Sequence, residues 1–485
     1  MYILRKFIAF TLALTLLSGC TAAQPDEKAE GQPTNTEDPV ISTVVDPVDM
    51  FSSRDYAADY DVSKCQTITL NGSTVHIQNE GSYILSGTLE NGQIVVNAKD
   101  TDKIQLILNG VHISSNSSAA IFVQQADKVF ITTAKGTENT LRSGGSFEET
   151  EYNIDAVVFS KEDLTLNGEG SLIIESPAGH GVVSKDDLAV TGGNYVVTSA
   201  GHGFAGKDSV RVAGGTFSVT AGKDGFHAEN NDDITLGFGY FSGGSFRISA
   251  EGDGISASNS LLIAGGDYQI TAGGGSENGT KANSGNYGGF PGGGRPGGGR
   301  PGGKGDTGST QTDENSTSMK GVKAGGDLTI QNGAFQINAA DDGVHSNANL
   351  TVSGGSFHIA TGDDGFHAEE TLTVTSGEIT ITESYEGLEG HHILVSDGEI
   401  DLIARDDGLN AAGGVDSSGM GGRDQMFGGP GGPGGMGRGD GSIVISGGTL
   451  YVQASGDGID ANGTLEIRGG DVIVCGPTTG DTATL

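Results

Sequence analysis

The chain has 485 residues and a formal net charge of −36, and it contains 85 glycines and no tryptophan. So strong a negative charge excludes free nucleic acid as a natural partner. A chain of this length exceeds a single compact core, so it is either divided into domains or built from repeats that add one unit at a time.

Residues 1–19 have the pattern of a signal peptide. Arg5 and Lys6 precede an apolar run, residues 7–17, that is too short to span a bilayer comfortably. The run ends in Leu17-Ser-Gly-Cys20, which looks like a bacterial lipobox, where the cysteine thiol takes the lipid. We therefore expect a lipoprotein anchored through Cys20 on the extracellular face of the cell membrane. The alternatives are a plain signal peptide or a short membrane helix.

The next segment, residues 20–60, is rich in Pro, Thr, Asp and Glu and predicts a flexible tether. Residues 61–160 alternate apolar and polar positions less regularly, as expected of the atypical coils and cap that close a solenoid. Residues 161–485 predict regular coils. Cys65 and Cys475 would then lie near opposite ends, too far apart for a disulfide.

A repeat of about 22 residues organises the regular part. Residues 350–369 indicate a strand, a Gly-Gly turn, a second strand, an Asp-Gly turn and a short strand, and Asp342 and Asp364 mark successive Asp-Gly turns. Alternation with period two is typical of strands. A fixed period in this range indicates a solenoid. The sequence therefore predicts an all-β parallel β-helix with coils about 4.8 Å apart. The period excludes the nine-residue calcium-binding β-roll.

Two glycine-rich stretches, residues 274–317 and 414–441, interrupt the repeat and predict loops inserted at turns. Neither has glycine at every third position, which excludes collagen. The alternative is that Arg295, Arg300 and Lys304 contact a cell wall or polymer.

An aromatic position recurs in phase with the inward-facing aliphatic residues, so we expect its rings to stack in the core. The residues are Tyr195, Phe217, Phe246, Tyr268, Phe335 and Phe357. Exposed rings that could stack on sugars are instead expected at Tyr240, Tyr287, Tyr385 and Tyr451.

An acidic position also recurs, at the Asp-Gly turn and just beside it. Carboxylates about 4.8 Å apart repel by roughly 3 kcal/mol at an effective dielectric of 20, so a cation is expected to neutralise them. Ca²⁺ takes six to eight oxygen ligands. The alternative is that Asp-Gly is simply a favourable turn dipeptide. We expect His345 and His367 to be groove residues or turn partners. The candidate metal ligands are Asp224, Asp253, Asp341, Asp342, Asp363, Asp364, Glu369, Glu386, Glu389, Asp406, Asp407 and Asp457.

A basic position recurs at Lys161, Lys185 and Lys207, each followed by an acid. It predicts either surface ion pairs of little energetic value or a strip that receives sugar carboxylates. These lysines and Tyr385 are the candidate carbohydrate-binding residues. We expect Lys223 and Arg405 to be the only basic residues beside the acidic position. We identify no catalytic residue.

Several phrases resemble a bacterial family of carbohydrate-binding right-handed parallel β-helices. They are GGSFRISA (243–250), DDGFHAE (363–369), SYEGLEG (384–390), DDGLNAAGG (406–414) and LILNGVHI (106–113). The resemblance covers residues 65–476 and implies a fold like that of polysaccharide lyases, with calcium and binding of cellulose and acidic sugars. We therefore expect a monomeric, non-catalytic lipoprotein that binds polysaccharide such as cellulose or polygalacturonate. The alternatives are a calcium-dependent polysaccharide lyase and a structural adhesin with a protein partner.

Overall fold

The structure is a computed structural model that describes residues 45–72, 74–279, 318–411, 440–478 and 483–485. The expected lipidation site Cys20, most of the tether, Tyr287 and most of both glycine-rich inserts lie outside these residues. The described part is almost entirely strand, with two short 3₁₀ helices, η1 (Val62–Lys64) and η2 (Ser276–Asn278). None of its helices has the length and apolar character needed to cross a bilayer.

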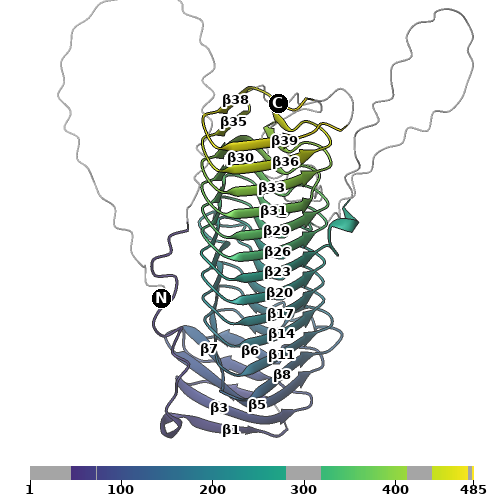
Figure 1. Cartoon of the computed structure of the whole chain (residues 1–485). Helices are drawn as coiled ribbons and strands as arrows, with labels where there is room; N and C mark the ends of the chain where they lie inside the picture. Colours follow the sequence, from purple (N-terminus) through teal and green to yellow (C-terminus); the bar gives the residue numbers. More distant parts are fainter. Residues whose placement is uncertain (1–44, 73, 280–317, 412–439, 479–482) are drawn as a thin grey trace, which may run out of the picture. The chain divides into compact units, whose positions relative to one another are not determined.

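The strands pair in parallel and stack into three ladders, as the green and yellow coils of Figure 1 show. The first ladder contains β7 (Lys128–Thr133), β10 (Asp163–Gly168), β13 (Asp187–Val190), β16 (Ser209–Val212), β19 (Phe238–Phe241), β22 (Leu261–Ile263), β25 (Leu328–Ile330), β28 (Leu350–Val352), β35 (Ser442–Ile445) and β38 (Thr464–Ile467). The second ladder contains β8 (Glu138–Ser143), β11 (Ser171–Ser176), β14 (Asn194–Ser199), β17 (Thr216–Ala221), β20 (Ser245–Ala250), β23 (Asp267–Ala272), β26 (Ala334–Ala339), β29 (Ser356–Thr361), β31 (Glu378–Glu383), β33 (Glu399–Ala404), β36 (Thr449–Ala454) and β39 (Asp471–Cys475). The third ladder contains β2 (Val75–Ile77), β4 (Ile94–Asn97), β6 (Ile121–Gln125), β9 (Ala156–Ser160), β12 (His180–Ser184), β15 (Phe204–Gly206), β18 (Phe226–Ala228), β21 (Ile255–Ala257), β24 (Val322–Ala324), β27 (Val344–Ser346), β34 (Leu409–Ala411) and β37 (Ile459–Ala461).

Four longer strands each take part in two ladders. Two of them, β3 (Gly81–Leu89) and β5 (Lys103–Ser115), follow the short first strand β1 (Gln66–Leu70), and β5 pairs with both β7 and β8. Two others, β30 (Phe366–Val374) and β32 (Leu388–Val395), run from the third ladder into the first ladder of the next coil. The prediction of an all-β parallel solenoid is confirmed.

Alternation of side chains fixes the register between coils. Along β17 and β20 every second residue is buried, and Phe217 pairs with Phe246. A shift of one residue would turn every apolar side chain outward, so the core specifies the register strongly. The long inserts leave it unchanged, since Tyr268 before the first insert pairs with Phe335 after it.

The two repeating glycines serve different purposes. The second glycine of the Gly-Gly turn has a positive φ, for example 125° at Gly215 and 100° at Gly355, a conformation in which other residues are strained. The glycine of the Asp-Gly turn is instead required for close approach of coils. A Cβ on Gly343 would lie 2.6 Å from the carbonyl oxygen of Gly365 on the next coil.

The N-terminal arm, residues 45–60, packs along the outside of the first ladder. The buried carboxylate of Asp55 accepts a hydrogen bond from Thr165 (2.6 Å) and pairs with Lys128 (2.9 Å). Farther along the stack, Val45 packs against Tyr240 and Leu262. The prediction that Tyr240 is exposed is therefore wrong, because this arm covers it to 8% exposure.

Candidate functional site

A groove of about 750 Å³ follows the outer face of the second ladder from β17 to β31. Its walls are two outward-facing rows of side chains, all of them polar except Ala334. The first row is Thr216, Ser245, Asp267, Ala334, Ser356 and Glu378, and the second is Ser218, Arg247, Gln269, Gln336, His358 and Thr380. Pairing of the strands places equivalent residues on adjacent coils, so the groove runs across the strands and along the stack.

The aromatic column lies beneath this face. Its rings are buried and stack with centroid separations such as 4.8 Å for Phe217–Phe246 and 4.7 Å for Phe335–Phe357. The prediction that the column packs in the core is confirmed. The stack therefore forms a rigid floor, and its rings do not face a ligand in the groove.

The second row supplies hydrogen-bonding groups of several kinds. Gln269 and Gln336 each offer amide donors and an acceptor, and exposed His358 follows on the next coil. Arg247 is exposed, and within the described residues its guanidinium forms no ion pair. An array of planar donors and acceptors at coil spacing can bind hydroxyl groups, and the guanidinium can bind a carboxylate in addition.

The predicted acidic position lies at the turn between the second and third ladders. Each coil from β12 to β37 has a glycine at this turn, and we call the residues directly before these glycines the turn column. They are His180, His202, Asp224, Asp253, Lys320, Asp342, Asp364, Glu386, Asp407 and Asp457.

The turn column is tied together by hydrogen bonds from the backbone of one coil to the side chain of the previous coil. The Oδ1 atom of Asp224 accepts the N–H of Asp253 (2.9 Å), and that of Asp342 accepts the N–H of Asp364 (3.1 Å). The same contact joins Asp407 and Asp457 (2.6 Å). These aspartates therefore have a structural role besides any role with a ligand.

Lys320 was missed by sequence reasoning, and the expectation that only Lys223 and Arg405 lie beside the acids is wrong. Its fully buried ammonium lies 2.8 Å from Asp341 Oδ2 and 2.9 Å from Asp342 Oδ2. Burial alone would raise the pKa of Asp342, but this ammonium and His345 hold it well below its usual range. The signal was present: Lys320-Gly321 precedes Asp342-Gly343 by 22 residues, at the Asp-Gly position.

The next coils hold a buried group of carboxyls around one imidazole. His367 Nδ1 lies 2.7 Å from Glu389 Oε2 and 3.2 Å from Asp364 Oδ2. Burial raises the pKa of Asp364 well above its usual range, and the charges of Glu389 and Asp363 raise it further. Burial would lower the pKa of His367, but these carboxylates raise it well above its usual range. His345 and His367 are turn partners, as one of the two expectations had it, since both are buried against the aspartates three residues before them.

A second acidic group follows on the last coils. Burial raises the pKa of Asp407 to about 7, and Asp406, Asp457 and Asp460 raise it in the same direction. Nearby, Glu386 accepts a hydrogen bond from Asn410 (2.8 Å), and Glu369 lies half-buried within β30. Asp253, on an earlier coil, is buried, and its pKa is raised to about 6 by burial and by Asp224.

The structure places the predicted carbohydrate-binding residues away from the groove. Lys161 and Lys185 lie over the rings of Tyr152 (5.2 Å) and Phe159 (5.4 Å), and Lys207 pairs with Asp232 (2.8 Å). These lysines come directly after the last residues of third-ladder strands, whereas the turn column lies at the start of those strands. Tyr385 is half-buried, next to Glu386 in the turn column. Cys65 and Cys475 are free, as expected.

Comparison with known proteins adds three findings. A model of the family described as carbohydrate-binding domain-containing protein matches residues 71–365 and 363–482. A protein of that description from Acetivibrio thermocellus is 32% identical over 198 residues, which are 40% of this chain and 64% of that protein, so the chain spans less than two thirds of its relative. A solved structure described as the polysaccharide lyase-like protein from C. thermocellum, gadolinium derivative, is 30% identical, with a TM-score of 0.41, over 43% of this chain and 91% of the other.

Proposed function

The chain belongs to the family of carbohydrate-binding domain-containing proteins, and we propose that it binds cellulose or an acidic polymer such as polygalacturonate in the groove on the second ladder, without cleaving it. The observation that carries the proposal is the groove itself. It is open along several coils, it is lined by hydrogen-bonding side chains, and one of these is an exposed guanidinium. An extended polymer can lie along such a groove, with its successive sugars meeting equivalent side chains.

Arg247 gives the groove its preference for acidic sugars. The chain carries a formal charge of −36, so an acidic polymer is repelled at a distance and needs a local positive group or a bridging cation. Arg247 offers the positive group within the second row. Asp267 and Glu378 in the first row offer acceptors for hydroxyl groups.

Calcium is the second part of the proposal, and the residues at the last coils fit it best. Asp406, Asp407, Asp457 and Asp460 place carboxylates on two adjacent coils, and the charges of Asp406, Asp457 and Asp460 all raise the pKa of Asp407. Such oxygens suit Ca²⁺. Asp341 and Asp342 fit less well, because Lys320 already supplies a positive charge there.

Burial of Lys320 supports the proposal that the protein does not cleave its ligand. A catalytic base must come within hydrogen-bonding distance of the substrate. Lys320, the lysine within the acidic group, is fully buried and paired with two carboxylates. For a lyase, the exposed candidates include Lys223 beside Asp224 and Arg247 in the groove. Release of unsaturated uronides from polygalacturonate, seen by ultraviolet absorbance, would favour that alternative.

Location is the third part. A lipid on Cys20 would hold the protein at the extracellular face of the membrane, with residues 20–44 as the tether before the packed arm. Labelling of cells with a lipid precursor, compared with a Cys20→Ala variant, tests this part alone.

Affinity gels containing soluble cellulose derivative or polygalacturonate test the groove. We expect the triple variant Arg247→Ala, Gln269→Ala, Gln336→Ala to lose binding to both polymers, since it removes the central second-row groups. The pair Lys185→Ala, Lys207→Ala is the matched control on the basic position. Binding that survives the triple variant and fails in the control would move the site to those lysines.

Chelation tests the calcium. If Ca²⁺ binds only the folded protein, EDTA should lower its Tm by several degrees through mass action. Asp406→Asn with Asp407→Asn should abolish that shift. The same Tm with and without chelator, and no calcium by elemental analysis, would contradict the calcium proposal while leaving the groove untouched.

A further inference from the structure

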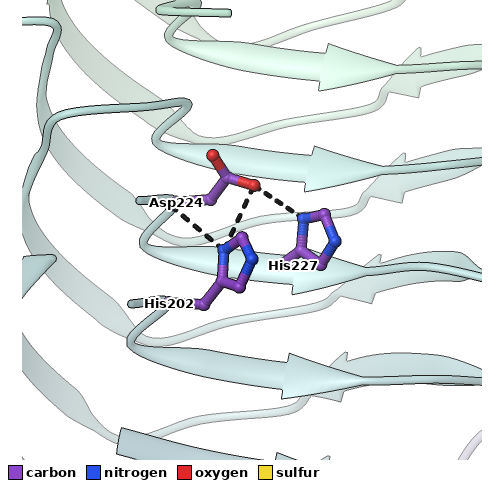
Figure 2. Close-up of side chains that lie close together, drawn as sticks. All are labelled: His202, Asp224 and His227. Carbon is purple, nitrogen blue, oxygen red and sulfur yellow. Dashed lines mark hydrogen bonds and ion pairs between the residues drawn. The ribbon is translucent and has the colours of Figure 1, made fainter. Parts of the chain in front are cut away.

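Two histidines and one aspartate converge at the turn column, on coils before the acidic groups described above. His227 Nδ1 lies 2.6 Å from Asp224 Oδ2, and His202 Nδ1 lies 3.3 Å from the same oxygen. The two imidazoles stack with centroids 4.0 Å apart. Figure 2 shows both rings directing a nitrogen toward the one carboxylate. We infer that His202, Asp224 and His227 form a binding site for a late first-row transition metal such as Zn²⁺, separate from the proposed calcium ligands.

His227 lies between two carboxylates, and that arrangement requires a cation. Its Nδ1 atom faces Asp224, while its Nε2 atom lies 2.7 Å from Glu229 Oε2. A neutral imidazole has only one N–H, so it can donate to only one of these acceptors. The second contact must be filled either by another proton or by a metal ion on the second nitrogen.

Glu229 determines which nitrogen is left for the metal. A metal-binding histidine usually donates its other N–H to a carboxylate or a carbonyl group, which fixes the tautomer and orients the ring. With the Nε2 proton on Glu229, the Nδ1 lone pair of His227 faces Asp224. The second layer of a metal site is therefore already in place.

His202 is already in the protonation state of a ligand. Its Nδ1 atom accepts the backbone N–H of Asp224 (3.2 Å), so this nitrogen carries a lone pair and no proton. The long hydrogen bond can be exchanged for a bond to a metal. On the coil before, His180 stacks on His202 with centroids 4.9 Å apart and limits the tilt of its ring.

The spacing suits a small tetrahedral ion. Zn–N and Zn–O bonds of about 2.1 Å place two tetrahedral ligands about 3.4 Å apart. The separation of His202 Nδ1 and Asp224 Oδ2 already has this value within a tenth of an ångström or so. The contact between His227 and Asp224 must open by less than 1 Å, which a small rotation of the imidazole allows. The three side chains are 11–13% exposed, so an ion and a fourth ligand from water can enter.

The other histidine clusters in the described residues lack these properties. At Asp342 and His345 the Lys320 ammonium occupies the position a metal would take, 2.9 Å from Asp342 Oδ2. At His367 one nitrogen faces both Asp364 and Glu389, with no second imidazole on the same oxygen. Imidazole nitrogen favours Zn²⁺, Ni²⁺ or Cu²⁺ over Ca²⁺, which prefers oxygen.

The test is titration of the full chain, stripped with chelator, with Zn²⁺ alone by calorimetry and with Co²⁺ alone by visible absorbance. We expect one Zn²⁺ per chain at this site and Co²⁺ bands of tetrahedral N/O coordination. His202→Gln with His227→Gln should remove both signals. Glu229→Gln should weaken Zn²⁺ binding by about 10–100-fold, as loss of an outer-shell partner does.

His391 and His392 provide the matched control, because their rings are also adjacent, with centroids 4.3 Å apart. His391→Gln with His392→Gln should leave the Zn²⁺ site intact. Loss of the site in this control and its survival in His202→Gln with His227→Gln would overturn the inference. Absence of stoichiometric Zn²⁺ binding to the wild-type chain would also overturn it, and would mean that His227 carries a second proton.

Discussion

One column of the third ladder changes character halfway along the solenoid. We call the first outward-facing residue of each strand in this ladder the outer column. On the early coils the outer column is apolar and is covered by residues 147–154. Its apolar residues are Val95, Phe122, Phe159, Val183 and Ala205. From the next coil it becomes His227, Ser256, Lys323, His345, His367, Glu389, Asn410 and Asp460. The backbone pairing is the same in both halves.

The contrast shows that the coil does not need charged groups at this position. The apolar half is held by packing around Phe122 and Phe159. The polar half buries carboxylates, imidazoles and Lys320, which cost solvation energy. Groups retained at such a cost are candidates for function. The proposed calcium ligands lie in the polar half, and the proposed Zn²⁺ site lies at its boundary, with Asp224 and His227 on the first polar coil and His202 on the coil before.

The largest expected effect is a loss of stability on removing Lys320, which lies in the polar half. Lys320→Ala leaves Asp341 and Asp342 buried without their cation, and we expect it to lower the free energy of unfolding by about 3–5 kcal/mol. Denaturant unfolding at neutral pH measures this. Adding Asp341→Asn and Asp342→Asn should restore much of the loss. A Lys320→Ala protein as stable as the wild type would show that the pairing contributes nothing.

The contributions of Asp407 and Asp55 to stability should depend on pH in opposite directions. The pKa of Asp407 is raised to about 7 from 3.8, so its contribution to stability is present below about pH 4 and lost as pH rises to 7. Burial would raise the pKa of Asp55, but its hydrogen bond from Thr165 and pairing with Lys128 lower it to about 2. Its contribution is present above about pH 4 and lost as pH falls to 2.

The free energy of unfolding of Asp407→Asn, taken relative to the wild type, should therefore be about 2 kcal/mol higher at pH 7 than at pH 4. This figure is reduced for solvent screening, because the carboxyl is partly exposed. Unfolding curves at both pH values, without calcium, measure this gain. Asp55→Asn is the comparison and should be most destabilised near neutral pH. An Asp407→Asn protein with the pH dependence of the wild type would contradict the assignment.

We expect polygalacturonate binding to depend on groove residues on the coils of the polar half. Arg247→Ala removes a charged donor from the groove and should weaken polygalacturonate binding by about 1.5 kcal/mol, roughly tenfold, with a smaller effect on a neutral polymer. Val196→Ala is the matched control, since Val196 is exposed at the equivalent position of β14, outside the groove. Equal loss in the two variants would argue against Arg247.

The smallest effect is expected at the basic position. Lys185 lies over Phe159 at the surface of the apolar half, so Lys185→Ala should change the free energy of unfolding by about 0.5 kcal/mol. Binding of polygalacturonate should be unchanged. A large loss of binding with stability intact would favour the basic strip over the groove.

The fold could be predicted because one local pattern recurs in register. Alternation around Phe217 and Phe357, with a glycine at each turn, specifies strand, inward face and coil length together. In a solenoid every coil contacts only its neighbours, so local patterns determine most of the structure. The position of the acidic residues in one column followed for the same reason.

The departures from prediction arise where sequence-distant segments meet. Lys320 follows an insert, so its place in the turn column depends on resuming the register after that insert. Tyr240 is covered by the arm, almost two hundred residues earlier in the chain. The groove depends on small and long outward side chains across several coils, and an alternating pattern reports only that they face outward.

The arm also determines how the molecule bears force. A pull on residue 45 is applied beside Tyr240 and Leu262, well inside the stack, and not at the terminal strand β1. The load then reaches the coils as shear on packed side chains and on the Asp55 contacts. Peeling an end coil breaks hydrogen bonds one after another, whereas shear loads many contacts at once. A solenoid pulled at this point can stay folded under a tension that would peel its end coil.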